Sequence, residues 1–435
     1  MAATASSPAA SGGRARALIG YGMAMAGPIG SAAAQFLLSL LLLRSVETAA
    51  FGRFSFLLVA SQFSWGIWSA LFGAPLPLLF NLTDTIARDR AVDSVTIANL
   101  IGAIGAFLLF LALGLATHES WSTSLLFAAF AAVALLRWFG RTYAYAASRQ
   151  VRTMVSDTVY AGLLLAGTIG AWALGVLTVQ VASAVMLVAA AAGLLPFGRE
   201  FLRRQFVDLH LTDLPAYRGI WRQHAGWSLI GVVTTEATAN SHAYLVTLLR
   251  GPSAFAPVAA SALLIRPVMV AINALADFER ARMARQLGAG ALEPALASRR
   301  LFLAALMAIW LVTGIASLVL LTAAPRLVFP PQYSLTFLAT GATLWLAVGL
   351  IRSLRAPQNV MLQAGGGFRP LAIASLWSAG VSVVGVAIMV MTVGPLWSIA
   401  GVALGEAVFA LAVWRTSRRW VRAARAQHHA TVATV

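Results

Sequence analysis

Twelve long apolar runs dominate the sequence, and each is about as long as a helix that crosses a membrane. Such a helix needs about 20 apolar residues to cross a ~30 Å hydrocarbon core. Only 10% of the residues are charged, against roughly 25% in soluble domains. The sequence therefore predicts an all-α integral membrane protein. The runs lie at approximately 17–43, 54–80, 95–117, 121–139, 154–176, 179–197, 225–249, 254–276, 301–323, 335–356, 371–392 and 396–414.

The orientation follows from the basic residues, all of which are arginine. With the N-terminus inside, the segments between runs that face the cytoplasm contain 23 arginines and the external ones contain four. Cytoplasmic loops carry such an excess, so we expect both termini inside. The formal net charge of +17 is thus a topology signal, and we expect no nucleic-acid partner. Cysteine is absent, which excludes disulfides and thiolate sites.

The cytoplasmic segment 198–224 divides the chain into two halves of six spans each. It mixes charges with Phe, Leu and Trp, which predicts an amphipathic helix on the inner leaflet. The halves are 17–197 and 225–414, with a tail 1–16 and a basic tail 415–435. Because six is even, both halves start inside, which predicts a parallel repeat about an axis along the membrane normal.

A short sequence echo supports this repeat. Leu42-Leu43-Arg44 precedes Ala50-Phe51 in the first half, and Leu248-Leu249-Arg250 precedes Ala254-Phe255 in the second. Both stand at the external turn between the first two spans of a half.

Enzyme signatures are missing from the sequence. Gly365-Gly366-Gly367 lacks the Lys-Ser/Thr of a phosphate-binding loop, and no His, Asp or Glu cluster has the spacing of metal ligands. External loops are short, so no extramembrane catalytic domain is expected. We therefore expect a protein that is not an enzyme and has no cofactor or metal, although coupling to H⁺ or Na⁺ is compatible with the sequence.

Two ionisable residues stand at matched depth on consecutive spans. Arg266 and Glu236 each lie ten or eleven residues from the inner end of a span, which is ~15 Å deep at 1.5 Å per residue. Charges at this depth are costly unless they are paired or hydrated. Two interpretations are open: a structural ion pair, or a cavity-facing cation gated by a carboxylate, which we favour.

The seventh span is unusually polar. Thr234, Thr238, Ser241 and His242 share one helical face, which we expect to face water; hydroxyls packed between helices are the alternative. His242 could titrate near neutral pH or simply bond to a carbonyl.

Arg352, Arg355 and Asn359 form one helical stripe at the end of span ten. If the helix continues past Pro357, both arginines lie in an inward-facing vestibule. If it stops there, they reach the inner phosphates. Glu406, in the middle of span twelve, is a third charge at membrane depth, without an evident partner.

Several local sequences resemble the polysaccharide-export flippases of the multidrug/oligosaccharidyl-lipid/polysaccharide exporter superfamily. Ala50 to Phe56 resembles the start of span two in that family, and Arg250 to Ala260 resembles the corresponding turn of the second half. Val328 to Tyr333 resembles the turn before span ten, with Pro330-Pro331 where a Gly is common. The similarity covers about residues 17–414.

The resemblance implies a V-shaped pair of bundles in the bacterial plasma membrane, with a cationic central cavity. Its substrate would be a polyprenyl-pyrophosphate-linked oligosaccharide, turned from the inner to the outer leaflet. Membrane lipids, and a polysaccharide polymerase with its export machinery, would be the partners. Arginine suits a pyrophosphate because its planar fork binds phosphate oxygens. We therefore expect substrate binding by Arg266, Arg352, Arg355, Arg53 and Asn359, and coupling or gating by Glu236, His242 and Glu406.

Two other functions remain open. A cation-coupled multidrug exporter of the same fold would have an acidic site in the first bundle, but spans one to four contain no Asp or Glu. A scaffold in envelope assembly that transports nothing is the third class, and it would tolerate loss of the intramembrane arginines.

Overall fold

The computed structural model describes residues 27, 29–80, 82–147 and 149–433, and they are almost entirely helical. The first half contains the helix Ile29–Ser45, α2 (Thr48–Trp68), a π-helical segment Ser69–Gly73, α3 (Leu76–Phe80), α4 (Thr85–Ala116), α5 (Trp121–Ala146), α6 (Gln150–Ala173) and α7 (Val179–Ala192). The second half contains α10 (Gly226–Arg250), α11 (Pro252–Leu263), α12 (Arg266–Gly288), α13 (Leu292–Ala323), α14 (Pro325–Val328), α15 (Leu335–Ala364), α16 (Phe368–Thr392) and α17 (Ser398–Ala433).

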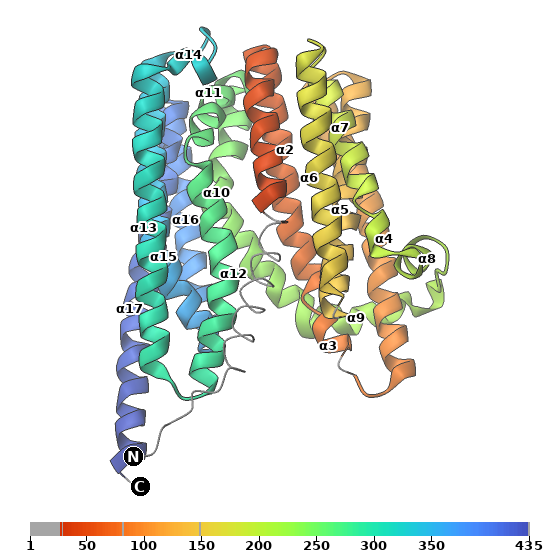
Figure 1. Cartoon of the computed structure of the whole chain (residues 1–435), viewed down its shortest axis with the longest axis vertical. Coiled ribbons are helices and arrows are strands. Elements are labelled where there is room, and N and C mark those ends of the chain that lie inside the picture. Colours follow the sequence, from red (N-terminus) through yellow and green to blue (C-terminus); the bar gives the residue numbers. More distant parts are fainter. Residues whose placement is uncertain (1–26, 28, 81, 148, 434–435) are drawn as a thin grey trace, which may run out of the picture.

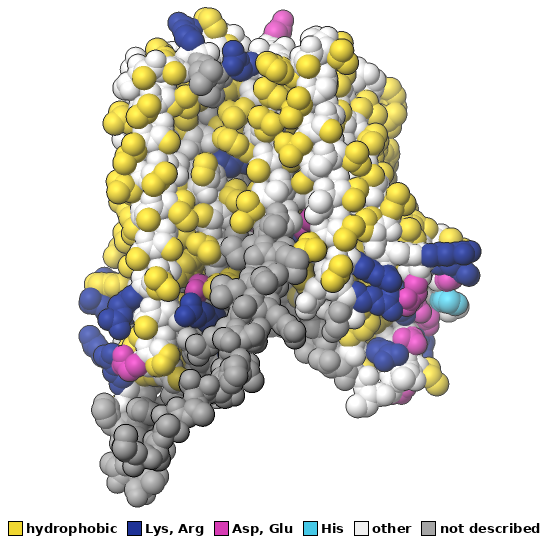
Figure 2. All heavy atoms as spheres, viewed as in Figure 1, with side chains coloured by type: hydrophobic (Ala, Val, Ile, Leu, Met, Phe, Trp, Pro, Cys, Tyr) yellow, Lys and Arg dark blue, Asp and Glu magenta, His cyan; other side chains and the backbone are white. Residues whose placement is uncertain are grey.

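Many of these helices are suited to cross a membrane. Within the described residues, nine are long and apolar enough to span it, or up to ten if α11 and α12 count as one broken span. The polar α10 and the shorter Ile29–Ser45 account for the remaining two apolar runs. Apolar side chains cover most of the visible surface, and charged side chains gather at its lower end (Figure 2). This distribution fits a multi-pass membrane protein.

The two halves form separate bundles that meet at one end of the molecule and diverge toward the other (Figure 1). The meeting end is the external side according to the arginine bias. There α2 crosses α11 so closely that a Cβ on Gly52 would lie 2.0 Å from the carbonyl oxygen of Pro252. The two echo sequences therefore lie on the helices that join the halves.

Several helices extend past the apolar runs that mark them in the sequence. Helix α5 continues to Ala146, so Arg141 lies on the helix and not in a cytoplasmic loop 140–153. Helices α12 and α13 likewise leave only a short turn between Gly288 and Leu292. A helix satisfies its own backbone hydrogen bonds in water as well as in lipid, so it can continue beyond its apolar residues.

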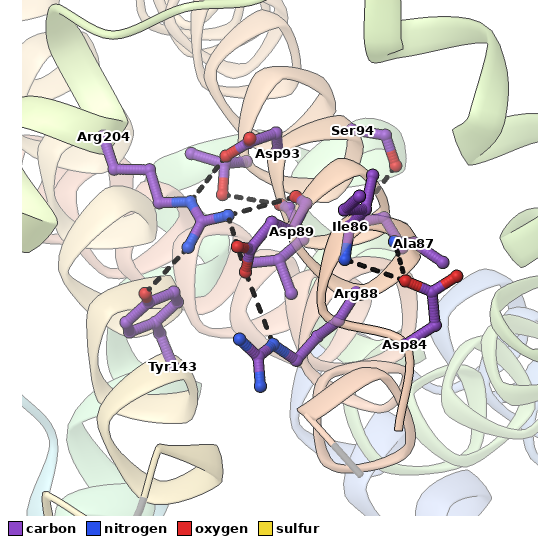
Figure 3. Close-up of polar contacts among 12 residues, drawn as sticks. Asp84, Ile86, Ala87, Arg88, Asp89, Asp93, Ser94, Tyr143 and Arg204 are labelled. Carbon is purple, nitrogen blue, oxygen red and sulfur yellow. Dashed lines mark hydrogen bonds and ion pairs between the residues drawn. The ribbon is translucent and has the colours of Figure 1, made fainter. Parts of the chain in front are cut away.

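The segment 198–224 is docked on the first bundle. Its helix α8 (Arg199–Phe206) buries Phe201 and Gln205 and leaves its charges outward. The side chain of Arg204 pairs with Asp93 at 2.5 Å and donates to the carbonyl oxygen of Asp89 at 3.1 Å (Figure 3). Helix α8 covers only eight residues of this segment, and its buried side chains pack on protein.

Candidate functional site

The eighth span breaks where Arg266 stands. Pro267 has no N–H and its ring clashes with the preceding turn, which kinks a helix. Helix α11 ends at Leu263, α12 begins at Arg266, and the two are bent by 65°. Arg266 is therefore the first residue of a helix that starts inside the membrane. A helix N-terminus carries a partial positive charge, so the side chain and the helix end favour an anion together.

Polar residues of the first bundle lie opposite Arg266. The Tyr160 hydroxyl is within electrostatic range of the Arg266 guanidinium. This hydroxyl accepts a hydrogen bond from Gln35 at 3.0 Å, and the Gln35 amide oxygen faces the Gln62 amide nitrogen at 3.5 Å. Gln35 and Tyr160 are buried. The three side chains give the boundary between the bundles a set of neutral hydrogen-bonding groups at membrane depth.

Glu236 is not the partner of Arg266. Its carboxylate accepts a hydrogen bond from the Asn240 amide at 2.6 Å, and Arg352 is the cation within its electrostatic range. Arg266 forms no ion pair with any residue that the structure describes. The structural ion pair that the matched depths allowed is therefore absent. Glu236, Asn240 and Tyr244 form a second stripe on α10, whose Tyr244 ring lies 6.0 Å from the Phe56 ring of α2.

Glu406 has two partners, which corrects the expectation that it had none. Its carboxylate lies 2.7 Å from Arg352 Nε and 3.0 Å from an Arg355 nitrogen. The side chain of Glu406 is 3% exposed. Arg355 also stacks over the Phe409 ring at 4.2 Å. Helix α15 continues through Pro357 to Ala364, but both arginines turn toward α17. Arg352 additionally donates to the sulfur of Met269, one turn beyond Arg266.

The predicted water-facing stripe of α10 is in fact packed against α16, which is a correction. Ser378 donates to the Thr238 hydroxyl at 3.1 Å, and the hydroxyls of Ser241 and Ser382 lie 3.4 Å apart. Small residues let two membrane helices approach closely, and hydroxyls then bond across them. His242 is also buried, between the rings of Phe255 of α11 and Trp345 of α15, at 6.1 and 5.0 Å.

The remaining expected site residues lie apart from this boundary. Arg53 is near the N-terminal end of α2 and pairs with Glu119 at 2.6 Å, within the first half. Asn359 is partly buried on the inner part of α15. Among the described side chains, the fold brings several expected residues into one region around Arg352, which pairs with Glu406, contacts Met269 one turn from Arg266 and lies within electrostatic range of Glu236. Arg355 joins them through Glu406.

A buried charged cluster in the first bundle was missed. Asp157 of α6 is buried and pairs with Arg137 and with Arg141 of α5, the latter at 3.1 Å. Arg137 also lies 4.3 Å from the centre of the Tyr160 ring. The sequence holds a signal for it, because Arg137 and Arg141 are four residues apart and share a helix face. An acidic residue thus exists in the first bundle, in the fifth span, but two arginines neutralise it.

The chain shares its fold with solved transporters. It aligns with an inward-facing multidrug resistance MATE family transporter of the MOP superfamily with a TM-score of 0.70 and 15% identity, over 93% of this chain and 99% of that chain. An outward-facing MATE transporter gives 0.60 at 14% identity over 93% and 95%. A MATE transporter of Vibrio cholerae gives 0.59 at 14% identity over 92% and 95%.

No protein-family model and no curated protein matches the sequence. At these identities the likeness concerns the fold. It confirms the expected all-α membrane architecture, which is that of MATE transporters of the MOP superfamily.

Proposed function

We propose that the chain is an alternating-access transporter that moves a polyprenyl-pyrophosphate-linked oligosaccharide from the inner to the outer leaflet of a bacterial plasma membrane. Both termini then face the cytoplasm. The energy comes from H⁺ or Na⁺ coupling, and a polysaccharide polymerase with its export machinery receives the product. The fold supports a transporter, since the solved neighbours include inward-facing and outward-facing forms.

The observation that supports an anionic substrate is Arg266. It stands at a helix N-terminus within the membrane, at the boundary between the bundles, without a carboxylate partner among the described residues. Isolated charges in this environment are costly and mark substrate pathways. A pyrophosphate supplies the missing negative charge and accepts the bidentate bonds of a guanidinium. Gln62, which is only partly buried, offers hydrogen bonds to the attached sugar.

The multidrug alternative has its own support. The solved neighbours are multidrug transporters, and Glu236 is a partly buried carboxylate on the face of α10 that meets α2. The charge balance favours the lipid-linked anion. Among the side chains that the structure describes, five arginines lie at or near membrane depth against three carboxylates: Arg137, Arg141, Arg266, Arg352 and Arg355, with Asp157, Glu236 and Glu406. A site for cationic drugs needs the opposite balance.

Purified protein in liposomes tests the proposal. The probe is a fluorescent polyprenyl-pyrophosphate disaccharide, whose exposure on the outer leaflet is followed by dithionite quenching. Losing a charged hydrogen-bonding group costs about 1.5–3 kcal/mol, so Arg266→Ala should slow flipping roughly 10- to 100-fold. Arg266→Lys should recover only part of the rate, because an ammonium lacks the planar fork.

Two control variants sharpen the test. Arg369→Ala removes an exposed arginine of the cytoplasmic side and should leave flipping unchanged. Glu236→Ala combined with Arg266→Ala should restore nothing, because the structure does not pair the two residues. Transport of a lipophilic organic cation without lipid flipping would establish the multidrug alternative. Transport of neither probe would favour the scaffold.

A further inference from the structure

The second helix of the chain changes its backbone hydrogen bonding just before Pro75. Helix α2 passes into a π-helical segment at Ser69–Gly73, in which Ala74 N–H donates to the Ser69 carbonyl at 2.7 Å; we call this segment and Pro75 the bend. In an α-helix the Leu71 carbonyl would accept from residue 75, but Pro75 has no N–H to give. The Leu71 carbonyl therefore lacks its α-helical donor and can accept from a donor on another element.

The segment that joins the two halves supplies this donor. The Tyr217 hydroxyl donates to the Leu71 carbonyl oxygen at 3.0 Å, and the Tyr217 ring stacks on Phe72 with centroids 5.9 Å apart. Burial raises the pKa of Tyr217 to about 12. The hydroxyl therefore keeps its proton and remains a donor at any physiological pH.

The same segment also holds α2 just before the bend. Gln205 of α8 is fully buried and accepts a hydrogen bond from Asn99 of α4 at 3.1 Å. The side-chain oxygen Oδ1 of Asn99 in turn accepts from Trp68 Nε1 at 2.7 Å. Trp68 is the last residue of α2 before the π-helical segment.

Beyond Tyr217 the chain enters the second bundle almost at once. A second π-helical segment, Trp221–Ala225, leads directly into α10. Helix α10 lies along α2, where a Cβ on Gly66 would be 2.9 Å from the Val232 side chain. Helix α8 is fixed to α4 by the pair of Arg204 and Asp93 (Figure 3). A rotation of α10 relative to the first bundle must therefore be taken up by the few residues around Tyr217, which lie between α8 and α10.

We propose that Tyr217 is a latch between the two bundles, which holds the bent form of α2 while the inner side is open and releases it as α10 rotates to close that side. This inference rests on the alternating-access part of the proposed function and is independent of the substrate. The net free energy of one hydrogen bond corresponds to a roughly fivefold change in the ratio of the inner-open to the inner-closed population.

Spin-label distances measure that ratio directly. The chain contains no cysteine, so Ala87→Cys and Ala289→Cys, exposed on the inner ends of the two bundles, place the only two labels. Tyr217→Phe keeps the ring and removes the hydroxyl. In this variant we expect the long-distance, inner-open population to fall roughly fivefold relative to the others. Tyr143→Phe removes a hydroxyl that contacts Arg204 at 3.4 Å and not the bend, and it should change nothing.

A double-mutant cycle isolates the bond. Pro75→Ala gives the Leu71 carbonyl a donor within its own helix, so adding Tyr217→Phe to that variant should have no further effect. Additive effects, or a distance distribution in Tyr217→Phe equal to that of the unsubstituted chain, would overturn the latch. Amide hydrogen exchange over residues 69–76 should rise in Tyr217→Phe; exchange that stays unchanged would also overturn it. None of these measurements needs a substrate. They therefore test the latch separately from the proposed substrate, even if the lipid-flipping assay fails.

Discussion

Glu406 is the carboxylate that two arginines share in the second bundle, and its removal has a predictable cost. Glu406→Gln leaves the charges of Arg352 and Arg355 buried without compensation. Breaking a buried ion pair in this way costs about 3–5 kcal/mol. We expect a clear fall in the thermal unfolding midpoint of the detergent-purified protein, read by differential scanning fluorimetry.

The matched control is a carboxylate at the surface. Glu293 pairs with Arg425 at 2.9 Å, but both side chains are more than half exposed. Such pairs contribute little, so Glu293→Gln should leave the midpoint almost unchanged. If Glu406→Gln were as mild as this control, the buried arginines would have to be compensated by another group.

At the residue scale the sequence identified charges at membrane depth but not their partners. Arg352 and Glu406 are 54 positions apart, and a single sequence holds no periodicity that links them. The role of Asp157 could not be predicted for the same reason, because it lies 20 positions from Arg137. The i, i+4 arrangement of Arg137 and Arg141 was visible in the sequence. Arg266 could be found because it stands about ten residues inside an apolar run, where a charge is costly unless it is paired or hydrated.

At the scale of helices, the crossing of α2 and α11 holds the two bundles together at the end where they meet, which the arginine bias predicts to be external. Gly52 fits because it has no Cβ; a Cβ there would lie 2.0 Å from the Pro252 carbonyl oxygen and 3.1 Å from the Ala256 side chain. Gly52→Val must therefore separate the two helices. We expect the protein to shift toward an outward-open form. Ala256→Cys, buried in this contact, should then react faster with a membrane-impermeant maleimide applied from outside.

Gly105→Val is the control for this prediction. Gly105 is also in a helix of the first bundle, but nothing lies within 4 Å of its Cβ position, so Ala256→Cys should stay protected in that background. Protection that persisted in Gly52→Val would mean that the crossing does not close the external side.

The helices themselves could be predicted well, because an apolar run of membrane length fixes both their existence and their approximate position. What each face of a helix contacts could not be predicted. The hydroxyl stripe of α10 was expected to meet water, yet it bonds to Ser378 and Ser382 of α16. Polar residues in membrane helices serve cavities and helix contacts alike, so periodicity alone does not separate the two. The sequence likewise shows Pro75 in the second span, but nothing in it links this region to Tyr217.

At the scale of the whole molecule, orientation rests on the arginine bias and can be tested with single cysteines, since the chain has none of its own. Ser122→Cys and Gln332→Cys, exposed at the external end, should react with an impermeant maleimide in intact cells. Ala289→Cys and Leu211→Cys should react only after permeabilisation. Leu211 is decisive, because it lies exposed in the segment between the bundles. Labelling there in intact cells would place that segment outside and would contradict the orientation that the arginine bias predicts.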